Sequence, residues 1–71
     1  MIIDNTVEID SPIYADTEYQ SENELIVYFR RRKGYIVVYD VSESTFLKLQ
    51  KDPSHERMQS ILRTHPRRHK F

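Results

Sequence analysis

The residues of this chain best suited to binding chemistry are four consecutive cations, Arg30, Arg31, Arg32 and Lys33. Such a run can hold phosphate groups through charge attraction and the release of counterions. Exposed cations also have a structural use, because they keep a sheet edge from pairing with other chains. Taken alone, the run favours the structural interpretation, since basic runs of this kind occur on many protein surfaces.

Three tyrosines, Tyr28, Tyr35 and Tyr39, lie close to these cations in the sequence. An aromatic ring on a sheet surface can stack on an unpaired base while a neighbouring arginine holds the backbone. Tyrosine is also common in strands because it packs well there. The combination of tyrosines and cations is more specific than either alone, and the two interpretations are about equally supported.

The C-terminal segment adds the cations Arg63, Arg67 and Arg68, followed by Lys70. They can extend a nucleic-acid footprint or contact an acidic protein surface. Chain ends are commonly poorly ordered, so we expect residues 65–71 to form a flexible basic tail.

Two histidines of this tail, His65 and His69, have the four-residue spacing that suits metal ligation on a helix. Pro66 lies between them, and the remaining histidine, His55, is distant in the sequence. A zinc site needs more ligands than this pair supplies. We therefore expect neither a metal site nor a cofactor.

The charges of the chain are sorted by position. Residues 1–29 contain seven acids and no Lys or Arg, whereas residues 30–71 contain all eleven bases and four acids. Such asymmetry between halves indicates a charged partner. The inference holds only if the two halves do not neutralise each other in the fold, so the placement of the acidic segment relative to the basic run becomes the main structural question.

The sequence offers no catalytic constellation. It has no cysteine and a single glycine, so a thiol nucleophile and a glycine-rich phosphate loop are both excluded. A chain of 71 residues also leaves little room for a deep active site. No apolar run approaches the ~20 residues that cross a bilayer, and the start resembles no signal peptide. We expect one non-enzymatic, cytoplasmic domain over residues 1–71, with no membrane contact.

The elements that must position the cations and tyrosines begin with a predicted β-hairpin. Two β-branched and aromatic runs, residues 24–30 and 35–41, flank a loop that ends at Gly34. Short strands over 6–10 and 13–19, with a turn at 20–23, precede it. With an even loop, position 30 would face 35 and 28 would face 37, which places Tyr28, Tyr35, Tyr39 and Arg30 on one face. The aliphatic side chains would then occupy the other face.

The second half of the chain changes to a helical period. Ser42 or Ser44 can cap a helix that runs to about Lys51, and Asp52 with Pro53 predicts the start of a second helix that runs to about residue 64. Its apolar residues Met58, Ile61 and Leu62 share one side. The predicted fold is α+β: a small antiparallel sheet of three to four strands with a central hairpin over 24–41, followed by two short helices packed on one face.

Short motifs along the chain resemble those of the KTSC domain. They are Ser11 and Ile13, then Leu25-x-Val27-x-Phe29, then Gly34, then Asp40-Val41. The KTSC domain is a module of about this length, found at the C-terminus of some lysyl-tRNA synthetases and as a free-standing small protein in bacteria and phages. The resemblance covers residues 11–63, and it implies a domain for which RNA binding has been suggested.

The chain departs from the KTSC pattern at several positions. Ile36 and Val38 stand where the family has Tyr-x-Tyr, and Ser42 stands where it has proline. The segment that begins at Ser54 lacks the family's glycine, and the loop after residue 29 is longer and more basic. The loss of the aromatic pair weakens the transfer of an RNA-binding role to this chain.

Two functions fit these observations. The first, which we favour slightly, is a protein-interaction module, such as a phage-encoded or bacterial small protein that binds or inhibits a host factor. It is favoured because seven N-terminal acids and a neutral total charge are unusual for a dedicated RNA-binding protein. The second is a module for RNA or other single-stranded nucleic acid that uses the basic hairpin tip and the tyrosines. A homodimer fits both, since so small a core gains stability from a partner.

Overall fold

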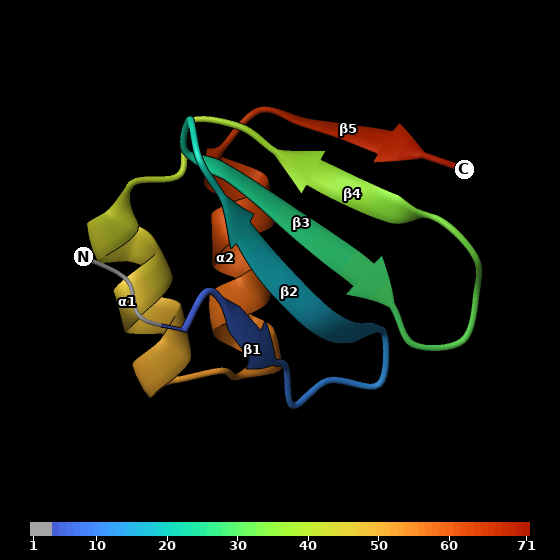
Figure 1. Cartoon of the computed structure of the whole chain (residues 1–71). Helices are drawn as coiled ribbons and strands as arrows, with labels where there is room; N and C mark the ends of the chain where they lie inside the picture. Colours follow the sequence, from blue (N-terminus) through green and yellow to red (C-terminus); the bar gives the residue numbers. More distant parts are fainter. Residues whose placement is uncertain (1–3) are drawn as a thin grey trace.

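The computed structural model describes residues 4–71 and shows an α+β fold (Figure 1). The elements are β1 (Thr6–Glu8), β2 (Tyr14–Gln20), β3 (Glu24–Phe29), β4 (Tyr35–Val38), α1 (Glu43–Lys51), α2 (His55–Thr64) and β5 (Arg67–Lys70). The strands form one antiparallel sheet in the order β1-β2-β3-β4-β5, and both helices lie on the same side of it. The predicted fold class is therefore confirmed, with five strands instead of three to four.

The central hairpin keeps the predicted faces but has a different register. Tyr28 pairs with Tyr35 and Ile26 with Val37, which is two residues away from the predicted pairing. The end of β3 turns to β2 instead of continuing along β4, since Arg30 donates its backbone N–H to the Ile13 carbonyl at 2.9 Å. Because the shift is even, each side chain stays on its predicted side of the sheet.

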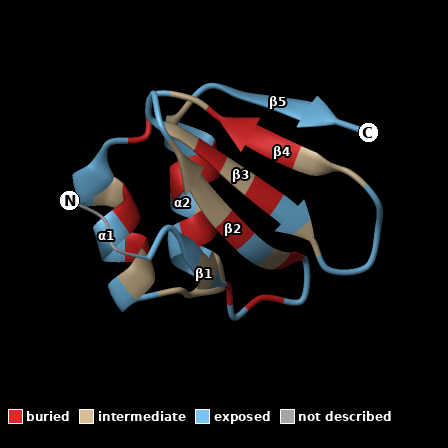
Figure 2. Ribbon diagram, in the orientation of Figure 1, coloured by how far each residue is buried: buried red, intermediate tan, exposed pale blue. Residues whose placement is uncertain are grey.

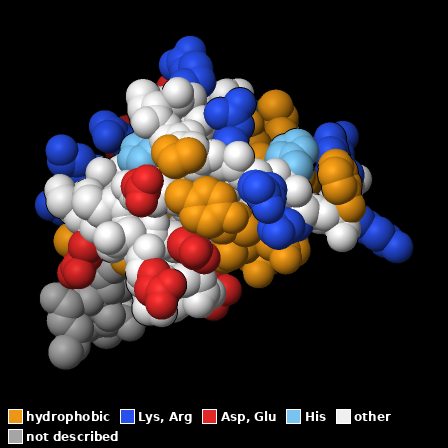
Figure 3. Space-filling view, turned by 90° about the horizontal axis from the view of Figure 1, so that it is seen from above, with side chains coloured by type: hydrophobic (Ala, Val, Ile, Leu, Met, Phe, Trp, Pro, Cys, Tyr) orange, Lys and Arg blue, Asp and Glu red, His pale blue; other side chains and the backbone are white. Residues whose placement is uncertain are grey.

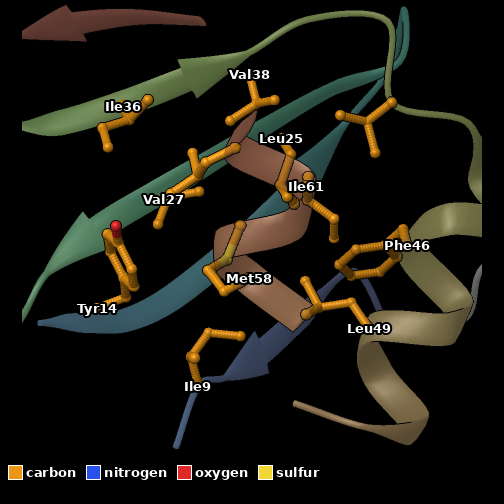
Figure 4. Packing of buried hydrophobic residues seen from close by; sticks show 12 residues of the cluster. Ile9, Tyr14, Leu25, Val27, Ile36, Val38, Phe46, Leu49, Met58 and Ile61 are labelled. Carbon is orange, nitrogen blue, oxygen red and sulfur yellow. The ribbon is translucent and has the colours of Figure 1, made fainter. Parts of the chain in front are cut away.

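The core lies between the helix-covered face of the sheet and the two helices. The sheet contributes the buried alternate residues Leu25, Val27, Ile36 and Val38, and the helices contribute Phe46, Leu49, Met58, Ile61 and Leu62 (Figures 2 and 4). The strand side chains predicted from a period of two therefore pack against the α2 side chains predicted from the i, i+3, i+4 spacing. Burial of these apolar side chains is the main source of stability for so small a domain.

One of the two predicted helix caps is confirmed and the other is wrong. Ser42 caps α1 through its hydroxyl, whereas α2 is capped by Ser54 and not by Asp52. Asp52 instead ends α1 as its C-cap. Pro53 lies outside α2 because its carbonyl accepts the Asp10 N–H at 2.8 Å, which ties this connection to the end of β1.

The segment that we expected to be a flexible tail contains strand β5. His65 is extended, with φ −130° and ψ 150°, as favoured for a residue before proline, and α2 therefore ends at residue 64. After Pro66 the chain reverses and pairs with the open edge of β4, where Arg68 lies opposite Val37. Within residues 4–71, neither helix has the length and apolar character needed to span a bilayer.

Candidate binding face of the sheet

Within residues 4–71, one face of the sheet is covered by no helix, and we call it the outer face. The helices lie behind the sheet in the view of Figure 1, so the face toward the viewer is open. Side chains of alternate strand residues point to this side, away from the buried ones. By the strand register its residues are Thr6 and Glu8 on β1, Asp16 and Glu18 on β2, Ile26 and Tyr28 on β3, Tyr35 and Val37 on β4, and Arg68 and Lys70 on β5.

The outer face changes character in strand order. Its acidic margin on β1 and β2 carries Glu8, Asp16 and Glu18, and its basic margin on β5 carries Arg68 and Lys70. Between the margins, β3 and β4 contribute apolar and aromatic side chains. Figure 3 views the molecule from above, past the β5 edge of the sheet, and shows a group of hydrophobic side chains between acidic and basic ones; the order across the strands comes from their register. One face thus presents acid, apolar and base in sequence.

Two tyrosines form the centre of the outer face. Tyr28 and Tyr35 are directly paired across β3 and β4, and their ring centroids lie 5.9 Å apart at an interplanar angle of 53°. Tyr28 is 40% exposed, whereas Val37 beside it is only 6% exposed. A hollow of about 440 Å³ adjoins Tyr28 on its acidic side, next to Glu8 and Glu18. The centre can therefore receive apolar groups, and the nearest charges on one side are carboxylates.

Arg30 does not lie on the tyrosine face, although the sequence predicted that it would. Its Nε donates to the Ser11 carbonyl at 2.9 Å, and its Nη2 donates to the carbonyls of Ile9 and Tyr14 at 2.9 and 3.2 Å. The guanidinium therefore fixes the connection between β1 and β2. This position follows from the end of β3 at Phe29, after which the chain turns toward that connection.

The other tip cations lie in the loop between β3 and β4. The Arg32 guanidinium stacks over the Phe29 ring at 4.5 Å from its centroid, and Arg31 and Arg32 border a groove of about 250 Å³ with Ile13. Phe29 packs against the core, so this groove is not part of the outer face. The loop also approaches β5, since a Cβ at Gly34, where φ is +96°, would lie 2.6 Å from the Lys70 carbonyl.

The remaining predicted site residues are spread over the fold. Arg67 donates to the Leu62 carbonyl at 2.7 Å, Arg63 is exposed on α2, and Tyr39 lies just past the end of β4. The histidines also have structural contacts: His65 Nδ1 lies 2.9 Å from the Ile61 carbonyl, and the His69 ring meets Phe29 edge-on at 5.5 Å. Of the residues predicted from sequence, the outer face therefore combines Tyr28, Tyr35 and Arg68.

The sheet order separates the acidic margin from the basic one. The strands β1 and β5 lie at opposite edges with three strands between them, so the basic margin lies about 19 Å from the β1 carboxylate and about 14 Å from those of β2 at the usual strand spacing. Both separations exceed the screening length of about 8 Å at physiological salt. Arg30 is the exception, since it borders a hollow beside Glu8 and Asp10. The domain is therefore dipolar across its sheet.

A partly buried serine–histidine pair lies apart from this face. Ser11 Oγ lies 2.7 Å from His55 Nδ1 and also accepts the backbone N–H groups of Ile13 and Tyr14 at 3.0 and 3.1 Å. The two lone pairs of the oxygen are thus used within the fold, and the pair ties the β1–β2 connection to α2. The Tyr14 ring stacks on His55 at 5.7 Å, and burial raises the pKa of the Tyr14 hydroxyl, a shift that Arg67 partly opposes.

Sequence reasoning missed this pair because its members are 44 residues apart. It also missed the acidic margin, although the alternation of Asp16 and Glu18 along β2 was a signal that both carboxylates share one side of a strand.

No known protein family matches the chain, and no curated protein or solved structure matches it either. The resemblance to the KTSC domain therefore stays a prediction.

Proposed function

We propose that this chain is a non-enzymatic protein-interaction module that binds its partner through the outer face. The observation that carries the proposal is the order of acidic margin, aromatic and apolar centre, and basic margin across the five strands. The partner that fits has a complementary apolar patch flanked by charges in the reverse order.

The chemistry of the outer face resembles that of a protein interface. Such interfaces have a centre rich in aromatic side chains, where most binding energy arises, and a polar rim that contributes specificity and association rate. Tyr28 and Tyr35 supply the centre, since Tyr28 is 40% exposed and a partner can cover it. The two charged margins supply the rim and fix the orientation of the partner.

Single-stranded nucleic acid is the second candidate ligand. Strand β5 supports it by placing Lys70 directly opposite Tyr35, so a cation stands beside an aromatic ring on the outer face. The hollow next to Tyr28 argues against it, because Glu8, Asp16 and Glu18 line that hollow and would repel a phosphate backbone. The protein interface therefore accounts for more of the face than nucleic acid does.

An affinity pull-down with the tagged chain, carried out with and without nuclease, tests the proposal. Tyr28→Ser removes the aromatic centre, and Leu47→Ser is its matched control, since Leu47 is also 40% exposed but lies on α1. We expect capture of protein that survives nuclease, is lost with Tyr28→Ser and persists with Leu47→Ser. Capture that disappears after nuclease treatment would refute the proposal and favour the nucleic-acid ligand.

A further inference from the structure

The outer face is complementary to itself, and we propose that its partner is a second copy of this chain stacked face to face. This inference rests on the proposed function and names the partner of the same surface. Homodimer interfaces are commonly isologous, so the same patch must satisfy itself after a twofold rotation. The acid–apolar–base order of the outer face meets that requirement.

The geometry follows from a twofold axis that runs parallel to the strands and between β3 and β4. Rotation about this axis reverses the strand order, so β2 of one copy lies over β5 of the other, and β3 lies over β4. Glu18 then faces Arg68 of the second copy, because the register places both in one row across the sheet together with Ile26 and Val37. The same rotation brings Ile26 against Val37 and Tyr28 against Tyr35 of the second copy. Two sheets stacked in this way form an aligned sandwich with a shared apolar centre.

The edges of the sheet are less suited to self-association than its face. The edge of β1 is occupied, since Gln50 Nε2 donates to the Asp4 carbonyl at 2.6 Å and lies 3.4 Å from the Thr6 carbonyl. Pairing of β5 with β5 of a second copy would bring Arg67, Arg68 and Lys70 close to their own copies, which like charges oppose. Stacking of the outer faces instead brings opposite charges together at both margins.

The size of the face sets the expected affinity. The overlapping strands β2 to β5 have four to seven residues, so at about 3.3 Å per residue and about 4.8 Å between strands they give a patch of roughly 300–400 Å² per copy, which is the size of a weak interface. We therefore expect a dimer with a dissociation constant of about 1–100 µM, and sedimentation equilibrium from about 1 to 500 µM covers the transition.

Charge reversal on one chain separates contacts between copies from contacts within a copy. Glu18→Lys alone and Arg68→Glu alone each place like charges together twice per dimer, and we expect each to weaken dimerisation about tenfold. The double variant Glu18→Lys/Arg68→Glu restores opposite charges and should return to within about twofold of the original affinity. Rescue cannot arise inside one chain, because the two residues lie on β2 and β5, about 14 Å apart at the usual strand spacing.

Glu56→Lys, an equal charge change on α2, is the control and should leave the dimer unchanged. Thermal unfolding of each variant checks that it is folded. A chain that stays monomeric at 500 µM, single reversals that do not weaken the dimer, or a double variant without rescue would each overturn the inference. The chain could instead stay monomeric and still capture a different protein through Tyr28 after nuclease treatment. That result would overturn the second copy as the partner but leave the proposed interaction function standing.

Discussion

Arg30 and Arg31 are adjacent in sequence and identical in type, yet the fold uses only the first, so they make a matched test. Three hydrogen bonds join the Arg30 guanidinium to the carbonyls of Ile9, Ser11 and Tyr14. A hydrogen bond within a protein contributes a net 0.5–1.5 kcal/mol, and Arg30 is exposed, so the freed carbonyls can regain water. We therefore expect Arg30→Ala to lower the free energy of unfolding by about 2 kcal/mol.

That loss is large for this domain. A chain of 71 residues has an expected stability of roughly 4–10 kcal/mol, and each kcal/mol shifts the midpoint of thermal unfolding by about 4–8 °C. Arg30→Ala should therefore lower the midpoint by about 8–16 °C, whereas Arg31→Ala, an exposed tip residue, should change the free energy by less than about 0.5 kcal/mol. Circular dichroism during heating and in urea measures both variants. Equal midpoints for the two would refute the assignment of Arg30 to the fold and return it to the binding surface.

Three further predictions concern packing and pH. Gly34→Ala should destabilise the contact between the tip and β5, because the new Cβ would lie 2.6 Å from the Lys70 carbonyl and position 34 has a φ of +96°. We expect faster hydrogen exchange of the β5 amides, and unchanged exchange would contradict this prediction. Ser11→Ala should lower the free energy of unfolding by about 1–3 kcal/mol, because it leaves His55 Nδ1 and two backbone N–H groups without their hydrogen-bond partner. Urea unfolding measures this loss, and a change below about 0.5 kcal/mol would count against a structural role for the Ser11 hydroxyl. Burial raises the pKa of Tyr19 in the folded state above its unfolded value near 10, so its contribution to stability is present below pH 10 and is lost as the pH rises through the folded pKa. Urea unfolding from pH 8 to 11 should show this decline, and Tyr19→Phe should reduce it.

The parts of the fold that were predictable are those specified by local periodicity. The alternation along β3 and β4 identified the buried set that includes Leu25 and Val27, and the spacing of Met58, Ile61 and Leu62 identified the packed side of α2. Both patterns reflect the solvent preference of single side chains, which needs no knowledge of distant contacts.

The parts that differed depend on contacts between distant segments. Strand β5 has no apolar alternation, since all four of its residues are exposed, and it forms only because the edge of β4 offers backbone partners. The cap of α2 moved from Asp52 to Ser54 because the Pro53 carbonyl bonds to the end of β1.

The candidate site shows the same division between local and distant signals. That Tyr28 and Tyr35 share one face followed from the hairpin pattern, whereas their direct pairing did not, since the predicted register placed Tyr28 opposite Val37. The acidic margin and the placement of Lys70 beside Tyr35 could be predicted only from the strand order, and no local sequence pattern contains that order. The sorted charges of the sequence thus become two opposite margins of one face.

The most direct test of the outer face as the binding surface is to map amide chemical shifts by NMR on the ¹⁵N-labelled chain. Spectra would be recorded over dilution from about 500 to 20 µM and after addition of a protein captured in the pull-down. We expect the largest changes at Ile26, Tyr28, Tyr35 and Val37, with smaller ones at Glu18 and Arg68. Changes confined to α1 and α2, or to the groove beside Phe29, would contradict the assignment of binding to the outer face.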